Sequence, residues 1–498
     1  MNAGTGAAAA PDTDGRWRTA VARAEQGATV ITLPLRVALA PLALALAAGR
    51  SAVRRPSCLV AAALLLVCLP SDLQEVAGGG RVTVADIAAA IAVAAAVWRS
   101  LRDGTLPQGR GRLGLLPFGA LVVSVAIATV VASDLAESLV GFVRYTELFV
   151  LIPVAVAFAL RERFDVLLVA GAFIAAAVFE GIVGIWQSAT NTGASYAGEY
   201  VRAIGTFGAE QVMALGALVG YGIVVTLALA LAARGRTRLA LVAVTALLVL
   251  PLAFSLSRGA WIATGCAVVV QLFAAGWRLG VAAVAVVTAA VGFLVSGVGP
   301  ASLTVDERLT SIVSSGSAPD RSVRDRYALW GTAVDIWADH PVAGVGLKDF
   351  AKVRDTYAPM SLSAGSDVDD PQGGFRREPL LSAHNQYLMV LAEQGTVGIL
   401  AFGSLIGTLT VGAFRRRVRP ARDGDRQQTG IDTRFLDLVA PGVMVWTLID
   451  FLYGDIGAGP TGVLLAVLLG LVARRAVIVP HRSGKRSDAH WSAPEVLR

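Results

Sequence analysis

The chain has 498 residues, of which 55% are hydrophobic and 16% are charged, and its formal net charge is +7. Its apolar residues fall in runs of about 14 to 23, and most of these runs are long enough to cross a hydrocarbon layer of about 30 Å as helices. This composition excludes a soluble globular protein. Because the basic residues cluster in short loops between apolar runs, they indicate membrane orientation and not a nucleic-acid partner.

The apolar runs predict an all-α fold, a polytopic membrane bundle of about 12 transmembrane helices. Cys58, Cys68 and Cys266 all lie within apolar runs, so they predict neither a disulfide framework nor a metal site. The predicted spans are 57–70, 83–98, 114–133, 139–160, 166–186, 211–233, 239–256, 260–276, 280–298, 396–414, 435–452 and 459–473.

Basic loops predict the orientation of these spans. Arginine clusters at 99–112, 161–163, 234–238 and 415–419 alternate with loops that contain fewer basic residues. By the positive-inside rule the arginine-rich loops face the cytoplasm, so both ends of the chain are expected there. Proline and arginine interrupt the segment 28–48, which we expect to lie at the membrane interface.

The predicted organisation along the chain has six parts. It begins and ends with disordered cytoplasmic segments of polar and small residues, and two transmembrane parts flank a long extracytoplasmic loop domain. The parts are a disordered N-terminus at 1–27, an interfacial or additional membrane segment at 28–56, an N-terminal transmembrane bundle at 57–298, the loop domain at 299–383, a C-terminal transmembrane part at 384–475 and a disordered tail at 476–498.

Two segments on the predicted outer side, 187–210 and 299–381, are too long to be simple turns. In the second, apolar and aromatic residues recur at helical spacing from Tyr327 to Trp337, and Asp339-His340-Pro341 ends the predicted helix. The aspartates of SAGSDVDDPQGG lack the spacing of a calcium loop, so we expect a flexible loop there.

The chain has only four histidines, and His384 stands at the start of the run SAHNQYLMVLAEQGTVGIL. With Ser382 as N-cap and Gly395 after the last turn, this run predicts a helix of about 12 residues, which is too short to cross a membrane. We therefore expect an interfacial or re-entrant helix that carries His384 on the same face as Leu388 and Leu391. The histidine is then either a hydrogen-bonded packing residue or a functional base.

Several arginines lie on the side of the membrane where the orientation predicts few. Arg144 lies early in its span, Arg202 precedes a span, Arg258 lies between two spans, and Arg326 begins the outer helix. Taken singly, each is a snorkelling or salt-bridged arginine, because an arginine that faces lipid costs about 2.5 to 3.5 kcal/mol. Taken together, they favour a diphosphate group, whose oxygens accept paired hydrogen bonds from guanidinium.

Four segments follow one another along the chain: RAIGTFGAEQVMA at 202–214, SLSRGAW at 255–261, RYALWGTAVDIWADHPVAGVGLKDF at 326–350 and SAHNQYLMVLAEQGTVG at 382–398. In this order, with a long outer loop before the His-Asn pair, they resemble the O-antigen ligase and polymerase superfamily of bacterial membrane glycosyltransferases. The resemblance extends over about residues 57–475.

The resemblance implies a multi-pass enzyme of the cytoplasmic membrane with its active site on the outer face. It implies a polyprenyl diphosphate-linked glycan as donor and no metal or other cofactor. In this family the histidine of the His-Asn pair activates an acceptor hydroxyl, which assigns that role to His384 and substrate contact to Asn385. The family's arginines bind the diphosphate, and the matching positions here are Arg258, Arg326, Arg202 and Arg144.

The chemistry implied by the resemblance leaves alternatives open. Ligases and polysaccharide polymerases of the superfamily share these motifs. A transporter of polyprenyl-linked glycans is the competing class, and internal repeats with polar residues at the membrane midplane would favour it. For the transferase, a glycan or glycolipid is the expected acceptor, since an outer domain of about 80 residues is small for recognising a folded protein.

Overall fold

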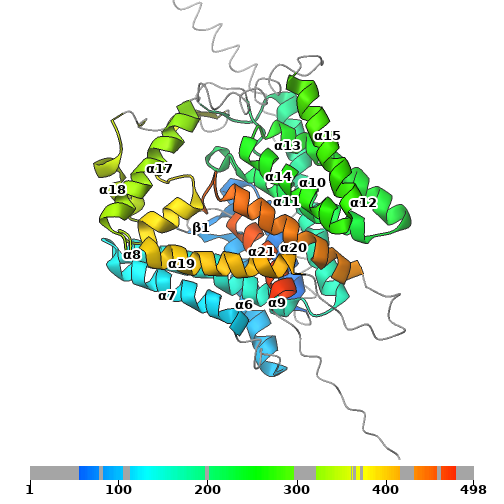
Figure 1. The fold of residues 1–498 in the computed structure, drawn as a ribbon, viewed down its shortest axis with the longest axis horizontal. Helices are drawn as coiled ribbons and strands as arrows, with labels where there is room; N and C mark the ends of the chain where they lie inside the picture. Colours follow the sequence, from blue (N-terminus) through cyan, green and yellow to red (C-terminus); the bar gives the residue numbers. More distant parts are fainter. Residues whose placement is uncertain are drawn as a thin grey trace, which may run out of the picture. The chain divides into compact units, whose positions relative to one another are not determined.

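The computed structural model describes residues 55–77, 82–104, 113–196, 201–295, 321–360, 362, 366–370, 374–378, 380–415, 431–456 and 461–477. The expected disordered N-terminus, the segment 28–48 and the expected tail after residue 477 lie outside these residues. Helices make up most of the described fold, as Figure 1 shows.

Short π- or 3₁₀-helical segments adjoin several of the helices. A π-helical turn at Glu147–Leu151 continues α8 into α9, and a 3₁₀ turn at Ala209–Gln211 precedes α11. The helices are α4 (Pro56–Leu66), α5 (Ser71–Gln74), α6 (Val84–Arg102), α7 (Leu116–Val131), α8 (Leu135–Thr146), α9 (Ile152–Ala159), α10 (Arg163–Thr190), α11 (Ala214–Ala232), α12 (Gly235–Leu247), α13 (Val249–Phe254), α14 (Arg258–Ala275), α15 (Trp277–Val295), α17 (Arg321–Asp339), α18 (Phe350–Tyr357), α19 (Gln386–Phe414), α20 (Ile431–Asp450) and α21 (Thr461–Ala476).

Each predicted span overlaps one or two of these helices, so the predicted helical membrane protein is confirmed. Within the described residues, eight helical stretches are long and apolar enough to cross a membrane. They are Val84–Arg102, Leu113–Val131, Leu135–Ala159, Arg163–Thr190, Ala214–Ala232, Gly235–Phe254, Arg258–Ala275 and Gln386–Phe414. The first predicted span corresponds to α4, which has 11 residues and is short for a crossing. The total of twelve crossings stays a prediction.

Contacts join the predicted outer loops to one another at one end of the bundle. The backbone N–H of Ser71, between the first two predicted spans, donates to the carbonyl of Thr206 at 3.1 Å. The N–H of Ala203 donates to the carbonyl of Phe254, just before α14, also at 3.1 Å. Loops that are far apart in the sequence thus contact one another, and the alternation of basic loops assigns them to the same side of the membrane.

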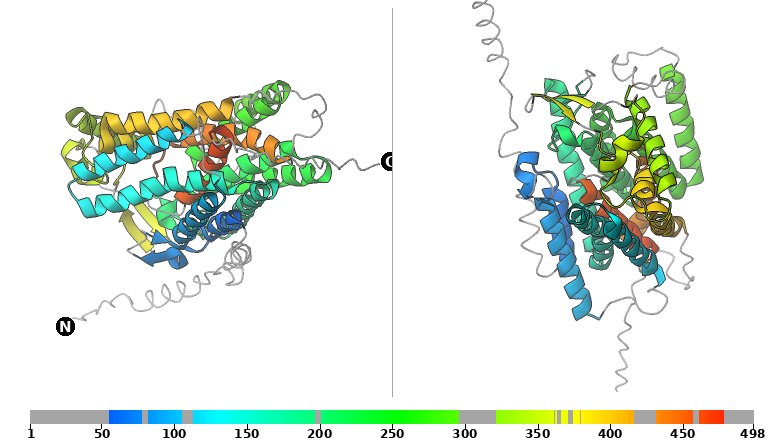
Figure 2. Two further views of the ribbon diagram at one scale, coloured as in Figure 1. Left: turned by 90° about the horizontal axis from the view of Figure 1, so that it is seen from below. Right: turned by 90° about the vertical axis from the view of Figure 1, so that its left-hand side faces the viewer.

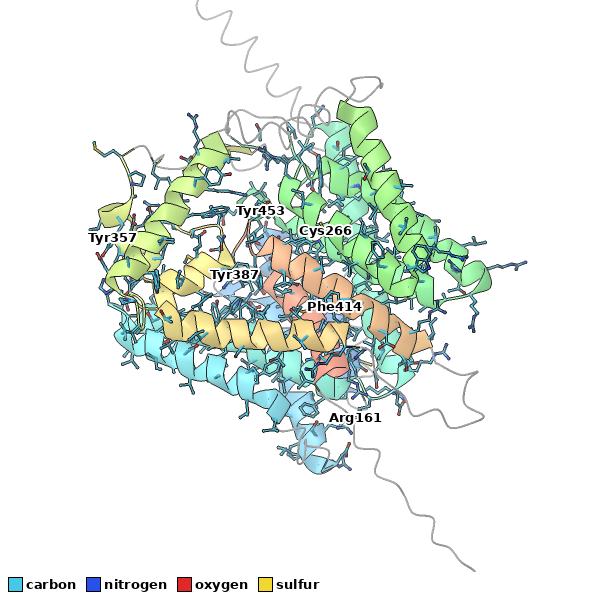
Figure 3. All side chains as sticks on the ribbon, in the orientation of Figure 1. Arg161, Cys266, Tyr357, Tyr387, Phe414 and Tyr453 are labelled. Atoms are coloured by element: carbon cyan, nitrogen blue, oxygen red, sulfur yellow. The ribbon has the colours of Figure 1, made fainter. Side chains whose placement is uncertain are left out.

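Contacts also join the predicted cytoplasmic loops at the other end. Arg161, between α9 and α10, forms an ion pair with Asp103 after α6, and Arg55 lies 2.8 Å from Glu162. Figure 3 labels Arg161 and, on α19, Phe414, which lies at the end of that helix opposite the His-Asn pair. The helix ends are therefore sorted into two groups, as a multi-pass protein requires.

The outer segments also contain β-structure, which corrects the all-α expectation for this part of the chain. Strands β4 (Ser366–Asp370) and β5 (Gly374–Glu378) pair antiparallel, and β3 (Ser195–Tyr196) of the first outer segment joins β4. A second pair consists of β1 (Glu75–Ala77) and β2 (Val82–Thr83). The strands are the arrows in Figure 2.

The expected flexible loop at SAGSDVDDPQGG was wrong for its aspartates. They form β4, and the register sets Asp367 opposite Arg377 and Val368 opposite Arg376. The sequence interpretation weighed the acidic run alone, without its basic partner strand GFRRE.

The helical part of the predicted extracytoplasmic loop domain, called the outer domain below, packs around its own apolar cluster. Leu329 and Ile336 of α17, Phe350 of α18 and Ala383 before α19 are all buried in it. The predicted end of the aromatic helix is confirmed, since α17 stops at Asp339. The cluster holds in place the segment that precedes the His-Asn pair.

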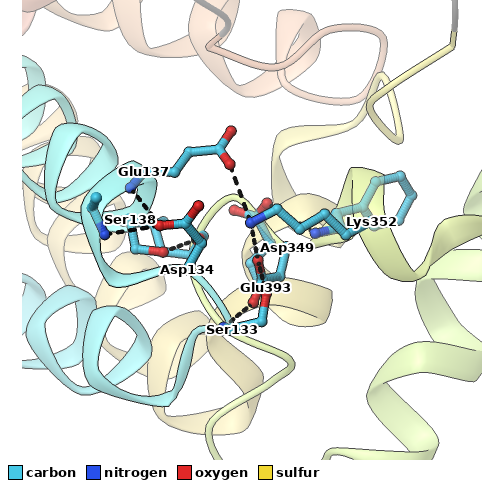
Figure 4. Close-up of polar contacts among 10 residues, drawn as sticks. Ser133, Asp134, Glu137, Ser138, Asp349, Lys352 and Glu393 are labelled. Carbon is cyan, nitrogen blue, oxygen red and sulfur yellow. Dashed lines mark hydrogen bonds and ion pairs between the residues drawn. The ribbon is translucent and has the colours of Figure 1, made fainter.

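A polar cluster fastens this domain to the turn between α7 and α8 (Figure 4). The buried carboxylate of Asp349 accepts hydrogen bonds from the hydroxyl of Ser133 at 2.9 Å and from Lys352 Nζ at 2.9 Å. Lys352 Nζ also lies 3.1 Å from Glu137 of α8. Burial alone would raise the pKa of Asp349, but the hydrogen bonds from Ser133 and Lys352 outweigh it and hold that pKa below its ordinary value.

Candidate functional site

His384 precedes α19 and does not lie within it, which corrects the expected helix start. Asn385 is the N-cap, and its side chain accepts the N–H groups of Tyr387 at 3.0 Å and Leu388 at 3.1 Å. Ser382 instead accepts the backbone N–H of His384 at 3.2 Å. The expected helical face shared by His384, Leu388 and Leu391 therefore does not exist.

The backbone of His384 is held in an unusual conformation. Its φ is 47°, in the left-handed region that residues other than glycine rarely adopt. The two neighbours, Ala383 and Asn385, are buried, whereas His384 itself is only half-buried. Such strain costs on the order of 1 to 3 kcal/mol and persists where surrounding contacts enforce it. The contacts of its two neighbours therefore hold the backbone of His384 in one conformation, from which its imidazole projects.

Gln386, which the sequence interpretation did not single out, fastens this segment to the turn after α20. Its backbone N–H donates to the carbonyls of Phe451 at 2.9 Å and Gly454 at 3.0 Å, and its side-chain oxygen accepts the N–H of Ile456 at 2.8 Å. Its side-chain nitrogen donates to the hydroxyl of Tyr145 in α8. One buried amide therefore joins three parts of the bundle directly beside His384.

Two charged residues act on the imidazole of His384. Burial lowers its pKa below the ordinary 6.5, the guanidinium of Arg326 in α17 lowers it further, and the carboxylate of Asp455 opposes them. The net effect favours a neutral imidazole near pH 7. A neutral imidazole is suited to accept a proton.

A cavity of about 400 Å³ opens beside this segment, between α8, the outer domain and α19. Pockets for small molecules in proteins have volumes of about 300 to 1,000 Å³, so this one is large enough for a sugar-sized group. Its wall is partly apolar, with Val140, Leu347, Met389 and Val390 among the lining residues. The polar part of the wall includes Glu137, Arg144, Lys348, Ser382, Glu393 and Asp455.

Arg144 and Arg326 both lie close to the His384 segment. Arg144 of α8 lines the cavity and forms ion pairs with Asp86 and, at 3.3 Å, with Glu147. Asp86 is held in turn by a capping box at the start of α6. Arg326 is near enough to His384 to lower its pKa. The structure therefore brings these two arginines together around the His-Asn pair, from helices more than 180 residues apart.

Arg258 and Arg202 do not line the cavity. Arg258 is the first residue of α14, and a Cβ on the following Gly259 would lie 3.3 Å from Tyr453, which Figure 3 labels. Arg202 belongs to a backbone bridge with Ala194. Its segment reaches Arg258 through the hydrogen bond between Ala203 and Phe254. These two arginines thus share one neighbourhood at the N-terminus of α14.

The remaining predicted site residue, Asn385, has its side chain engaged in the fold. Besides capping α19, its amide nitrogen donates to the carbonyl of Leu452 at 3.4 Å. Sequence reasoning also missed Asp455, which lies in a short glycine-containing loop, YGDIGAG, on the predicted outer side. An acidic residue in such a loop was the available signal, but the sequence interpretation considered only arginines as charged site residues on this side.

Comparison with known proteins finds a family match for part of the chain. Residues 243–403 match the family model described as O-antigen ligase. The matched region contains Arg258, Arg326 and His384, whereas Arg144 and Arg202 lie outside it. Among curated proteins, no sequence matches the chain.

Proposed function

We propose, from the match of residues 243–403 to the O-antigen ligase family, that the chain belongs to this superfamily and transfers a glycan from a lipid-linked donor to an acceptor hydroxyl. The donor is a glycan on polyprenyl diphosphate, and the acceptor is a hydroxyl of a cell-surface glycan or glycolipid. The reaction takes place at the outer face of the cytoplasmic membrane. The observation that carries the proposal is the His384 segment: Ser382 and Gln386 on either side of it line the cavity, and the imidazole is near enough to Arg326 and Asp455 for both charges to act on it.

In the proposed reaction the acceptor oxygen attacks the anomeric carbon of the donor. The bond between that carbon and the diphosphate oxygen breaks, and polyprenyl diphosphate leaves with the electron pair. His384 takes the proton of the acceptor hydroxyl. Because a diphosphate is already a good leaving group, stabilising its charge supplies much of the rate enhancement, and a pair of hydrolase carboxylates is not required.

The arginines have distinct parts in this proposal. Arg258 lies at the N-terminus of an 18-residue helix, where the helix dipole also favours an anion. Arg202 adjoins it, and Arg326 reaches from the outer domain. These three bind the leaving diphosphate. Arg144, paired with two carboxylates, shapes the cavity wall.

The cavity beside His384 supports a sugar-sized acceptor. Its charged lining contains carboxylates of Glu137, Glu393 and Asp455 as well as the cations Arg144 and Lys348, so its charges nearly cancel. Carboxylates accept hydrogen bonds from sugar hydroxyls but repel phosphate. We therefore assign this cavity to the acceptor and the α14 side to the diphosphate. Asn385 contributes by fixing the backbone next to His384.

Purified protein in detergent tests the proposal. Given a polyprenyl diphosphate-linked glycan and cell-surface glycan or lipid fractions, it should transfer the glycan in one block and release polyprenyl diphosphate, with or without EDTA. A ladder of repeats that remains on polyprenyl diphosphate would instead identify a polymerase. If the donor stays intact with every fraction but moves across liposome bilayers, the protein is a transporter and the proposal is wrong.

A further inference from the structure

Glu180 is a buried carboxylate in the middle of α10 for which the proposed reaction has no use. It is fully buried inside the apolar bundle. Its two oxygens accept hydrogen bonds from the backbone N–H of Thr206 at 2.9 Å and from the hydroxyl of Thr206 at 2.6 Å. An acidic side chain within a membrane helix costs several kcal/mol unless partners compensate, and such residues are usually retained for a function.

Gln187 lies seven residues further along, which is the same face of the helix. Its side-chain oxygen accepts the N–H groups of Ile204 at 3.0 Å and Gly205 at 2.8 Å, and its nitrogen donates to the carbonyl of Gly205 at 2.8 Å. Two polar side chains of α10 therefore bind three consecutive residues of the loop before α11.

Gly205 shows how closely the loop fits these side chains. Its φ is 70°, and a Cβ added to it would lie 2.3 Å from an oxygen of Glu180. No other residue combines this backbone conformation with this approach at low cost. The loop conformation and the polar face of α10 are matched to each other.

The same loop carries Arg202. The N–H of Arg202 donates to the carbonyl of Ala194 at 2.8 Å, and the N–H of Ala203 donates to the carbonyl of Phe254 at 3.1 Å. With the bonds from α10, every backbone N–H from residue 202 to residue 206 has an acceptor. The backbone of Arg202 is thus fixed next to the N-terminus of α14 before any substrate binds.

We infer that Glu180 and Gln187 are positioning residues that hold Arg202 in place for the diphosphate of the donor. The inference rests on the proposed function for what Arg202 binds, but not for how its loop is held. A preorganised cation loses little freedom when it binds an anion, so releasing the loop weakens donor binding more than it slows the reaction.

A double-mutant cycle on glycan transfer tests the inference. Gln187→Ala should raise the KM for the polyprenyl diphosphate-linked donor about tenfold, which corresponds to about 1.4 kcal/mol, with a smaller change in kcat. In an Arg202→Ala background the same change should have less than about a twofold effect, because Gln187 acts through Arg202. Equal effects in both backgrounds would overturn the inference.

Two further variants separate positioning from general stability. Gln271 is a buried amide in α14 that donates to the carbonyls of Val224 and Leu438. Neither of these partners belongs to the loop that carries Arg202. Gln271→Ala should lower the thermal stability without changing the donor KM. Glu180→Ala should raise the KM, and Glu180→Gln should restore it, since glutamine still accepts the N–H of Thr206 and its own N–H₂ donates to the hydroxyl.

Hydrogen exchange of the purified protein tests the loop without any substrate. Gln187→Ala should speed amide exchange at residues 203–206, whereas Gln271→Ala should leave it unchanged. Unchanged exchange in Gln187→Ala would overturn the inference even if transfer is observed. Faster exchange in Gln187→Ala, combined with a protein that transfers no glycan, would refute the proposed function and the role of Arg202 in it. The conclusion that Glu180 and Gln187 hold this loop would still stand.

Discussion

The left-handed backbone of His384 links its position to its chemistry. Within a helix, an imidazole at this place would lie along the helix surface. The buried Ala383 and the N-cap Asn385 hold it outside the helix, near enough to Arg326 and Asp455 for both charges to act on it. The sequence singled out this residue, but not its conformation, because no local pattern marks a non-glycine residue with positive φ.

The two charged neighbours of His384 give opposite predictions for the pH dependence of transfer. The base must be neutral, so activity rises as pH passes through the pKa of His384. Asp455 raises that pKa, so Asp455→Asn should shift the acid limb of kcat/KM to lower pH. Arg326 lowers it, so Arg326→Gln should shift the limb to higher pH. If both variants shift the limb in the same direction, or neither shifts it, the group that titrates in the pH profile is not His384.

Replacing Arg258 by lysine keeps its charge but removes the planar fork. Charge-assisted hydrogen bonds are worth about 1.5 to 3 kcal/mol each, so Arg258→Lys should lower kcat/KM at least about tenfold and Arg258→Ala further. Transfer kinetics with a polyprenyl diphosphate-linked donor provide the measurement. Ordinary activity of Arg258→Ala would reduce Arg258 to an anchor of the turn before α14.

The break in α19 is the element that attaches the outer domain. The sequence correctly predicted a change at Gly395, whose φ is 64°. The break leaves the carbonyls of Ala392 and Glu393 available to the N–H groups of Val345 and Gly346, at 3.0 and 3.1 Å. The glycine-rich turn of the outer domain therefore docks on the broken helix and holds α17 above the site.

Gly395→Ala should disrupt this docking. A Cβ there would lie 2.4 Å from the carbonyl oxygen of Val342, and backbone atoms cannot move aside cheaply. With the unfavourable φ, we expect a loss of about 1 to 3 kcal/mol in thermal unfolding, and loss of transfer. Gly403 lies in the same helix with open space around its Cβ position, so Gly403→Ala is the matched control and should keep both. Equal behaviour of the two variants would contradict this account of the break.

The elements that the sequence predicted least well are those that depend on contacts with residues far away in the sequence. Apolar periodicity located the helices, because each helix carries its own pattern. The strand β4 could not be found this way, since it depends on β5 and on Ser195–Tyr196, which lies more than 160 residues earlier. Gln386 was missed for the same reason, since its partners come from other parts of the chain.

At the scale of the whole molecule, the contacts described above join loops that the arginine distribution assigns to the same side. The pairs Ser71 with Thr206 and Arg161 with Asp103 each join loops of one group. Packing alone does not identify which group faces the cytoplasm, so the orientation rests on the positive-inside rule.

Reporter tags test that orientation in cells. Tags at Gly109 and Asp423 should report the cytoplasm, because both lie in predicted arginine-rich loops. A tag at Ser366, in the outer domain, should report the opposite side. A cytoplasmic signal at Ser366 would move the site to the wrong face for a donor presented outside.

Glycan transfer by His384→Ala, compared with His340→Ala, tests the central claim most directly. His340 lies at the exposed end of α17, so its loss controls for removing an imidazole from the outer domain. Both proteins should insert and accumulate normally, since little packing volume is lost. We predict that His384→Ala loses transfer by about 100-fold or more, as expected for a missing general base, while His340→Ala stays near the unsubstituted protein. Unchanged transfer in a well-inserted His384→Ala protein would contradict the account and leave His384 as a packing residue.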